Sequence, residues 1–161
     1  MIRCLRPEQT WPLRQQVLHS SRPWPTSLDP LDLTPHALHL GWLAEGVLIG
    51  IGSIGRDTPA VGDPTTAHWR LRGMAVLDSH QGRGIGGKLL LVLLAHAASL
   101  DPAGTAWCLG RLPAEGFYLR YGFRQMGRFE VPGKGPRLML ERSLSGDPLA
   151  PTGVEYDVSA G

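Results

Sequence analysis

The stretch that says most about the fold of this chain runs from Gln81 to Lys88 and has the sequence QGRGIGGK. A β-like run ends just before it, near Leu77, and an apolar, helix-like run follows it from Lys88 to Leu100. A glycine-rich turn between a strand and a helix start suits phosphate, because glycines let backbone N–H groups approach an anion and the helix start adds unpaired donors. The stretch therefore predicts a phosphorylated ligand, with a ligand-free tight turn as the structural alternative.

Two short patterns in this stretch point to nucleotides, and both lack the context that such sites need. The pattern GxxxxGK, from Gly82 to Lys88, is close to a P-loop, but Leu89 stands where a P-loop needs Ser or Thr to hold Mg²⁺. The pattern GxGxxG, from Gly82 to Gly87, belongs in the first strand–helix turn of a dinucleotide-binding unit. Here the loop starts only at Gln81, so a nucleotide-binding domain is the weaker interpretation.

Length and charge narrow the class of protein. The chain has 161 residues and a net charge of +2. One domain with a real core fits that length. Arginines such as Arg14 and Arg72 are scattered and read as solvated surface, so the concentrated basic face of a nucleic-acid-binding protein is missing. No signal peptide is visible, and no apolar run reaches the ~18–20 residues of a membrane span. We expect a cytoplasmic protein without nucleic-acid or membrane partners.

The two cysteines, Cys4 and Cys108, are too few for a disulfide scaffold, and both lie in apolar runs. We interpret them as buried structural thiols. No Cys/His spacing typical of a zinc site is present, so no metal is expected.

Hydrophobic periodicity and turn signals predict an α/β mix in the order βα–ββ–βα–βα–ββ. Thr10 is expected to cap the first helix, with Pro12 in its first turn. Glycines in the third strand suggest a bulge or a close backbone approach. The helix after the glycine loop is apolar nearly all round and should pack under a sheet. The expected strands cover residues 2–5, 37–43, 47–56, 67–77, 104–109, 123–131 and 136–144, and the later helices cover 85–99 and 113–120.

Two separated segments together carry a family resemblance. The first is Gln81-x-x-Gly84-x-Gly86, which follows a strand-like run and precedes the apolar helix. The second reads AEGFYLRYGF, from Ala114 to Phe123. In this order and spacing they resemble the pyrophosphate loop and the second signature of the GNAT superfamily of N-acetyltransferases. The resemblance covers about residues 2–144. It implies a mixed, mostly antiparallel central sheet flanked by helices, one acyl-CoA N-acyltransferase domain over residues 1–144, and a tail over 145–161 whose composition predicts flexibility.

The resemblance also implies a cofactor and its contacts. Acetyl-CoA would be the co-substrate, with its pyrophosphate on the loop and its pantetheine arm along the preceding strand. Arg111 stands where many relatives carry Asn near the cofactor arm. The cofactor-binding residues expected on this basis are Met74, Ala75, Val76, Gln81, Gly82, Arg83, Gly84, Ile85, Gly86, Gly87, Lys88 and Arg111.

Catalysis is assigned in the same way. Tyr118 occupies the position of the family's general acid, and with an ordinary pKa near ~10 it keeps its proton at neutral pH. No general base stands out; Glu130, on the last hairpin, is a weak candidate. The expected reaction is direct transfer of an acetyl group to a primary amine in a ternary complex. A non-catalytic acyl-CoA-binding or regulatory module is the competing interpretation.

The acceptor amine, a small molecule or a peptide, is not readable from the sequence. The acceptor pocket is expected between Trp24, the loop over residues 21–35 and the hairpin over residues 129–135. Dimers are common in the family, so a homodimer is one option, although no residue here requires it.

Overall fold

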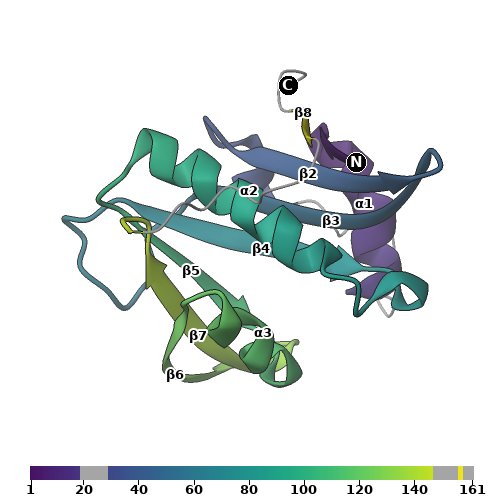
Figure 1. Ribbon diagram of the computed structural model, residues 1–161. Coiled ribbons are helices and arrows are strands. Elements are labelled where there is room, and N and C mark those ends of the chain that lie inside the picture. Colours follow the sequence, from purple (N-terminus) through teal and green to yellow (C-terminus); the bar gives the residue numbers. More distant parts are fainter. Residues whose placement is uncertain (19–28, 147–155, 158–161) are drawn as a thin grey trace.

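A computed structural model describes residues 1–18, 29–146 and 156–157 of the chain (Figure 1). Its strands form one eight-stranded sheet in the order β6-β7-β5-β4-β3-β2-β1-β8. The strands are β1 (Ile2–Cys4), β2 (Leu38–Ala44), β3 (Val47–Arg56), β4 (His68–Val76), β5 (Thr105–Gly110), β6 (Arg124–Val131), β7 (Gly135–Ser143) and β8 (Tyr156–Asp157). The helices are α1 (Pro7–Val17), α2 (Ile85–Leu100) and α3 (Glu115–Arg120), with short 3-10 turns η1 (Pro30–Leu33), η2 (Asp78–His80) and η3 (Leu112–Ala114).

Neighbouring strands run antiparallel in most of the sheet. The pairs β4–β5 and β1–β8 are parallel, and the hairpins β2–β3 and β6–β7 connect strands that are adjacent in the chain. The expected strands and the two later helices agree with the observed ones to within two residues at each end. The mixed, mostly antiparallel sheet flanked by helices is thereby confirmed.

Helices α1 and α2 cover opposite faces of the sheet, and α2 crosses the front face in Figure 1. Successive side chains of a strand point to opposite faces. On β3, Gly52 faces α2, where a Cβ atom would come within 3.0 Å of Leu93. The next residue back, Ile51, faces the other way and packs with Leu13 of α1. The glycines of β3 therefore let α2 lie close to the sheet, as the sequence suggested.

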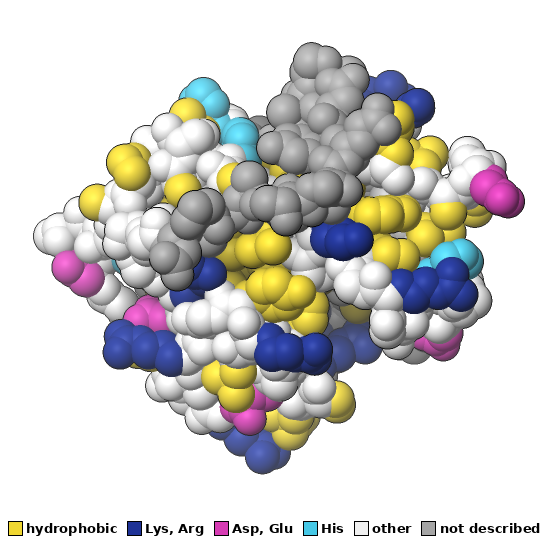
Figure 2. All heavy atoms as spheres, in the orientation of Figure 1, with side chains coloured by type: hydrophobic (Ala, Val, Ile, Leu, Met, Phe, Trp, Pro, Cys, Tyr) yellow, Lys and Arg dark blue, Asp and Glu magenta, His cyan; other side chains and the backbone are white. Residues whose placement is uncertain are grey.

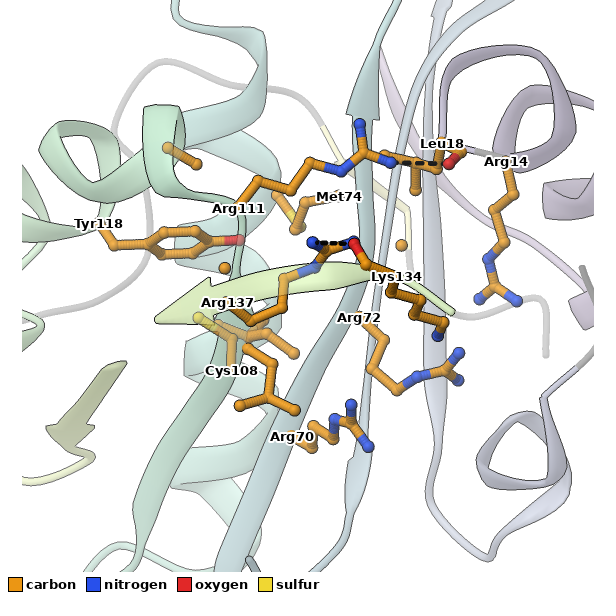
Figure 3. A pocket seen from close by; sticks show the side chains of 15 residues that line it. Arg14, Leu18, Arg70, Arg72, Met74, Cys108, Arg111, Tyr118, Lys134 and Arg137 are labelled. Carbon is orange, nitrogen blue, oxygen red and sulfur yellow. Dashed lines mark hydrogen bonds between the residues drawn. The ribbon is translucent and has the colours of Figure 1, made fainter. Parts of the chain in front are cut away.

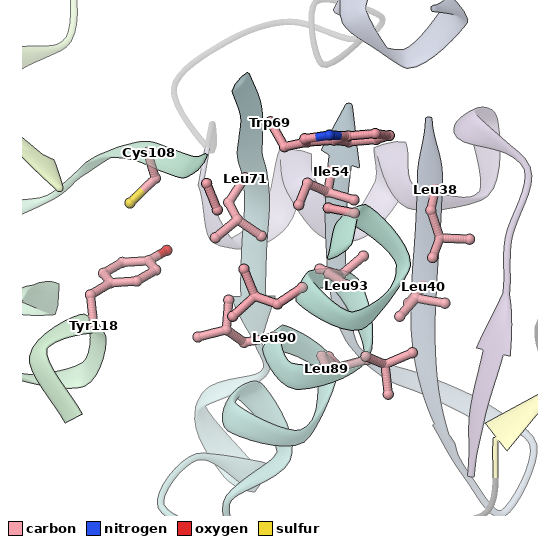
Figure 4. Close-up of a cluster of buried hydrophobic side chains, with 14 of the residues drawn as sticks. Leu38, Leu40, Ile54, Trp69, Leu71, Leu89, Leu90, Leu93, Cys108 and Tyr118 are labelled. Atoms are coloured by element: carbon pink, nitrogen blue, oxygen red, sulfur yellow. The ribbon is translucent and has the colours of Figure 1, made fainter. Parts of the chain in front are cut away.

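The apolar surface of α2 forms the centre of the main core (Figure 4). Leu89, Leu90 and Leu93 are fully buried against the inner face of the sheet. Burial of one leucine side chain contributes ~1.5–3 kcal/mol, so these contacts hold the start of α2, and with it the glycine loop, in one position. The sheet side chains drawn opposite them are Leu38, Leu40, Ile54, Trp69 and Leu71.

The expected start of α1 is wrong. The helix begins at Pro7, and Thr10 lies inside it, where its hydroxyl donates to the backbone carbonyl of Pro7 at 2.7 Å. A proline at the first helical position loses no hydrogen bond, because the N–H there has no acceptor in the helix. Pro7 is thus the start signal, and Pro12 lies in the helix interior. Cys4 is also only half-buried, whereas Cys108 is buried as expected.

At the end of the chain, β8 pairs in parallel with β1, with Tyr156 beside Ile2. The remainder of the expected tail over 147–161, like Trp24, lies outside the described residues, so the flexibility of the tail and the single domain over residues 1–144 stay predictions. None of the helices in the described ranges is both long and apolar enough to cross a membrane.

The site lies where β4 and β5 separate. Their parallel ladder has three residue pairs and ends at Arg70 and Trp107, while β4 continues to Val76 (Figure 1). Near its end β4 bulges at Gly73, which has a φ of +60° and sits where the register with β3 shifts. Beyond Arg70, β4 pairs on that side with no other strand of the described chain. This edge offers backbone N–H and C=O groups to an extended ligand.

Candidate active site

The loop between β4 and α2 has the conformation that its glycines allow. Gly82 and Gly84 adopt φ of +77° and +78°, in the left-handed region that favours glycine. Gly84 is the N-cap of α2 without a side-chain cap, and its carbonyl accepts from the backbone N–H of Lys88. The N–H groups of Ile85, Gly86 and Gly87 precede this first helical bond and have no acceptor within the helix. The loop therefore presents unpaired backbone N–H donors at the positive end of the helix dipole, an arrangement that suits an anion.

The side chain of Gln81 ties the loop to the end of β4. Its Nε2 donates to the backbone carbonyl of Val76 at 2.9 Å and to Oδ1 of Asp78 at 3.0 Å. The sequence interpretation placed Gln81 beside the phosphates. The observed bonds instead engage its amide nitrogen in holding the loop.

Two basic side chains predicted at the phosphates point to other partners. Arg83 is exposed, and its Nη2 lies 3.5 Å from the carbonyl of Ser79. Nζ of Lys88 lies 5.6 Å from the ring centroid of Trp42, within the range of a cation–π contact. The donors that the loop itself presents are thus mainly backbone N–H groups.

A cavity of about 430 Å³ lies beside the loop, between the end of β4 and α3. On the same face, Figure 2 shows hydrophobic side chains with Lys and Arg side chains around them. The volume falls within the ~300–1,000 Å³ of small-molecule sites. Arg83, Lys88 and Arg111 are not among its lining residues. The predicted cofactor residues that line it are Met74, Ala75, Val76, Gln81, Gly82, Gly84, Ile85, Gly86 and Gly87.

The opposite wall of this large cavity comes from α3 and was missed by the sequence analysis. Phe117, Arg120 and Tyr121 line it, and their spacing of three and four residues places them on one side of a helical segment. That spacing is the signal that could have found them. A Cβ atom on Gly87 would collide with the Tyr121 hydroxyl. The missing side chain at Gly87 therefore lets α3 close against the first turn of α2.

A second, smaller cavity of about 190 Å³ adjoins the first (Figure 3). Both cavities are lined by Met74, Ala114 and Tyr118, so they meet at these three residues. Arg111 was expected at the cofactor arm, but it lines the small cavity, where its Nη2 donates to the carbonyl of Leu18 at 2.7 Å.

Tyr118 lies at the junction of the two cavities and is only 7% exposed. Of the two adjacent aromatic residues on α3, Phe117 is the less buried. The Tyr118 hydroxyl points toward the thiol of Cys108 (Figure 4), and both side chains line the small cavity. Burial, with smaller contributions from Cys108, raises the pKa of Tyr118 well above its usual value. The phenol therefore stays protonated at neutral pH and is available as a proton donor.

Glu130, the weak candidate for a general base, lies away from this junction. It is exposed on β6 and lines neither cavity. The described residues that line the two cavities include no Asp or Glu. Across the described ranges of the chain, no cluster of His, Cys, Asp and Glu could hold a metal ion.

A buried polar network lies behind the small cavity. Arg14, read from the sequence as solvated surface, is 1% exposed, and its guanidinium donates to both Asp32 oxygens at 2.7 and 3.0 Å. Arg14 also donates to Ser53, whose hydroxyl lies 2.7 Å from Nδ1 of His39. Desolvation alone would raise the pKa of Asp32, but the bonds and charge of Arg14 outweigh it and lower that pKa. Burial lowers the pKa of His39, so its imidazole is neutral.

Arg72 joins the same network from β4. Its Nη2 lies 2.8 Å from Oδ2 of Asp29, and its Nη1 lies 3.5 Å from Oδ1 of Asp32. Burial lowers the pKa of Arg72 to about 10, which still leaves it charged at neutral pH. The carboxylates behind the small cavity thus hold two arginines in place at its wall.

Comparison with known proteins gives consistent matches. Residues 5–123 match the model of the acetyltransferase (GNAT) family. The chain is 25% identical to YitI of Bacillus subtilis (strain 168), described as an uncharacterized N-acetyltransferase, over 89% of this chain and 95% of that protein. ElaA of Escherichia coli superposes with a TM-score of 0.70 at 16% identity, over 89% of this chain and 99% of that one. An aminoglycoside 6'-N-acetyltransferase complexed with coenzyme A superposes with a TM-score of 0.65 at 15% identity, over 92% and 99%.

Proposed function

This chain belongs to the acetyltransferase (GNAT) family, and we propose that it moves an acetyl group from acetyl-CoA to a small primary amine while both substrates are bound. Membership of this family supports the general activity, which is acyl-CoA-dependent N-acyl transfer. The observation that supports direct acetyl transfer to an amine is the position of Tyr118. It lies where the large cavity beside the glycine loop meets the small cavity.

The large cavity is the proposed cofactor site. The pyrophosphate of coenzyme A would bind the N–H groups of Ile85, Gly86 and Gly87 and of the loop before them. One dipole contact of this kind is worth ~0.3–1 kcal/mol at an exposed site, so several convergent donors are needed. A Cβ atom on Gly87 would collide with the Tyr121 hydroxyl, so the start of α2 is closely packed at this point.

The free edge of β4 is the proposed seat of the pantetheine arm. The edge from Met74 to Val76 lines the large cavity and has no strand partner on the β5 side among the described residues. An extended arm could therefore bond to the backbone there as an added strand would. One N–H of this segment would stabilise the oxyanion that develops on the thioester carbonyl, since preorganised donors act most strongly where charge develops.

Tyr118 is the proposed general acid. When the amine nitrogen bonds to the acetyl carbon, the carbon–sulfur bond breaks and the leaving thiolate takes a proton from the Tyr118 hydroxyl. The amine loses a proton in the same overall reaction, which restores the phenol. Proton transfer of this kind contributes ~10²–10⁴ in rate.

Acetyl-CoA binding and turnover test the proposal separately. A ligand present at 100 times its Kd stabilises the folded state by ~2.7 kcal/mol, which is several degrees in Tm for a chain of this size. We expect that rise with acetyl-CoA, and release of free thiol when an acceptor amine is added. Stabilisation by ATP or NAD without any by acetyl-CoA would overturn the proposal. Binding of acetyl-CoA without thiol release across a broad amine panel would favour an acyl-CoA-binding module instead.

A further inference from the structure

The small cavity has a lining of one charge sign (Figure 3). Its described lining residues include six cationic side chains and no Asp or Glu. They come from α1, β4, the end of β5 and the β6–β7 hairpin, so they meet only in the folded chain. The six are Arg14, Arg70, Arg72, Arg111, Lys134 and Arg137.

Among the described residues, the carboxylates that pair with Arg14, Arg70 and Arg72 lie outside the cavity lining. Asp32 and Asp29 bind Arg14 and Arg72 from the protein side, and neither carboxylate lines the cavity. Arg70 is held in a similar way. Its Nη1 lies 3.5 Å from Oδ2 of Asp57, and its guanidinium carbon lies 4.9 Å from the ring centroid of Trp107. These three arginines are thus oriented by groups outside the cavity lining, while the described lining itself stays positive. An anion inside it would meet charges that are already in position, which limits the entropy lost on binding.

Two donors at this wall fit an anionic ligand. Nε of Arg70 is buried and has no hydrogen-bond partner among the described residues. A buried donor without an acceptor is unfavourable, and a ligand oxygen would satisfy it. Arg111 is exposed at the other side and donates to a neutral carbonyl, that of Leu18, so its charge remains available.

We propose that the small cavity is an acceptor site for small primary amines that also carry a carboxylate or phosphate group, such as an acidic amino acid. The anionic group would lie among Arg70, Arg72 and Arg111, and the amine would point to Tyr118 at the junction with the large cavity. This inference rests on the proposed acetyl transfer. The volume of about 190 Å³, below the usual range for drug-sized ligands, fits a molecule of amino-acid size.

The same charges assist the amine. Nearby positive charge disfavours the ammonium form of the acceptor and favours the neutral amine that must attack the thioester. A cavity with no carboxylate in its described lining can in this way supply a reactive amine without a side-chain base. A purely cationic amine would be repelled, whereas an acidic amine is held by its anionic end.

Matched pairs of acceptors test the proposal at constant ionic strength. L-Glutamate is compared with L-glutamine, and O-phosphoethanolamine with ethanolamine, while spermidine serves as the cationic probe. We expect kcat/KM from thiol release to be at least tenfold higher for an acidic member than for its neutral partner. The pair that shows the larger ratio distinguishes carboxylate from phosphate. A neutral amine or spermidine preferred over both acidic probes would overturn the proposal.

Variants and a binding readout separate this inference from the proposed function. Arg111→Gln and, independently, Lys134→Gln should raise KM for the acidic probe about tenfold and leave the Tm shift by acetyl-CoA intact. Arg128→Gln, exposed on β6 and outside both cavities, is the matched control and should change neither. Saturable binding of the acidic probe by calorimetry without thiol release would support the anion site and refute acetyl transfer. No binding and no turnover of either acidic probe would refute the anion site.

Discussion

The side chains of Tyr118 and Cys108 face one another in the small cavity, which both of them line. Tyr118 comes from α3 and Cys108 from β5, and both side chains are buried. Burial raises the pKa of Cys108 to about 12, so the thiol stays neutral as the phenol does. Cys108 thus stands beside the hydroxyl of the proposed acid on a strand of the sheet.

Replacement of Tyr118 by Phe should lower kcat by about a hundredfold or more, because the leaving thiolate would lose its proton donor. The affinity for acetyl-CoA, measured by calorimetry, should change little, since the ring remains. Because the pKa of Tyr118 is raised, the wild-type rate should show no loss from phenol ionisation as the pH rises to 9. A Phe variant with wild-type kcat would contradict the role of Tyr118.

Replacement of Cys108 by Ala should act through Tyr118. The phenol would lose the side chain that its hydroxyl faces, and kcat should fall as the orientation of the phenol becomes less fixed. Cys108→Ser restores a polar group of similar size there and should recover most of the lost kcat. If Ala and Ser gave the same kcat at equal folded fraction, Cys108 would be a packing residue only.

Replacement of Gly87 by Ala should damage the cofactor site. The new Cβ would collide with the Tyr121 hydroxyl, so the Tyr121 ring, which lines the large cavity, must move. We expect the Kd for acetyl-CoA to rise at least tenfold in a calorimetric titration. Gly116→Ala is the control, because no atom lies within 4 Å of the added Cβ and alanine favours a helix by up to ~1 kcal/mol. Equal acetyl-CoA affinity in both variants would refute the close packing at Gly87.

Acid should destabilise the protein through His39 before it affects Asp32. The pKa of His39 is lowered on folding, so the unfolded chain binds the proton more tightly. Stability is therefore fully present above the unfolded pKa of ~6.5 and is lost as the pH falls below it. Asp32, whose pKa is also lowered, adds a further loss as the pH falls below ~4. Between pH 7.5 and 5, the free energy of unfolding measured by urea denaturation should fall less in His39→Gln than in the wild-type protein. An equal fall in both would contradict the prediction.

Local patterns were enough to predict most elements and part of the site. The apolar run after Lys88 and the alternating strands are repeated over many residues, so their periodicity is unambiguous. The glycines from Gly82 to Gly87 predicted an anion site because positive φ and free N–H groups are properties of the backbone itself. The start of α1 was missed because Thr10 and Pro7 both carry helix-start signals, and only the neighbouring contacts select between them.

The sequence alone accounts for the strands, the buried helix α2 and the glycine loop before it, since each follows from the spacing of nearby residues. The arrangement of the strands in a mixed sheet was implied by the family resemblance. The cavities follow from tertiary contacts. Arg14, Arg72 and Arg111 are far apart in the chain; the sequence predicted the first two as surface charges and the third as a residue of the cofactor arm. They share one wall because β4 and β5 diverge and α1 packs behind them, with Asp32 neutralising buried charge. Charge and cavity shape depend on distance in space, which the order of residues along a chain does not reveal.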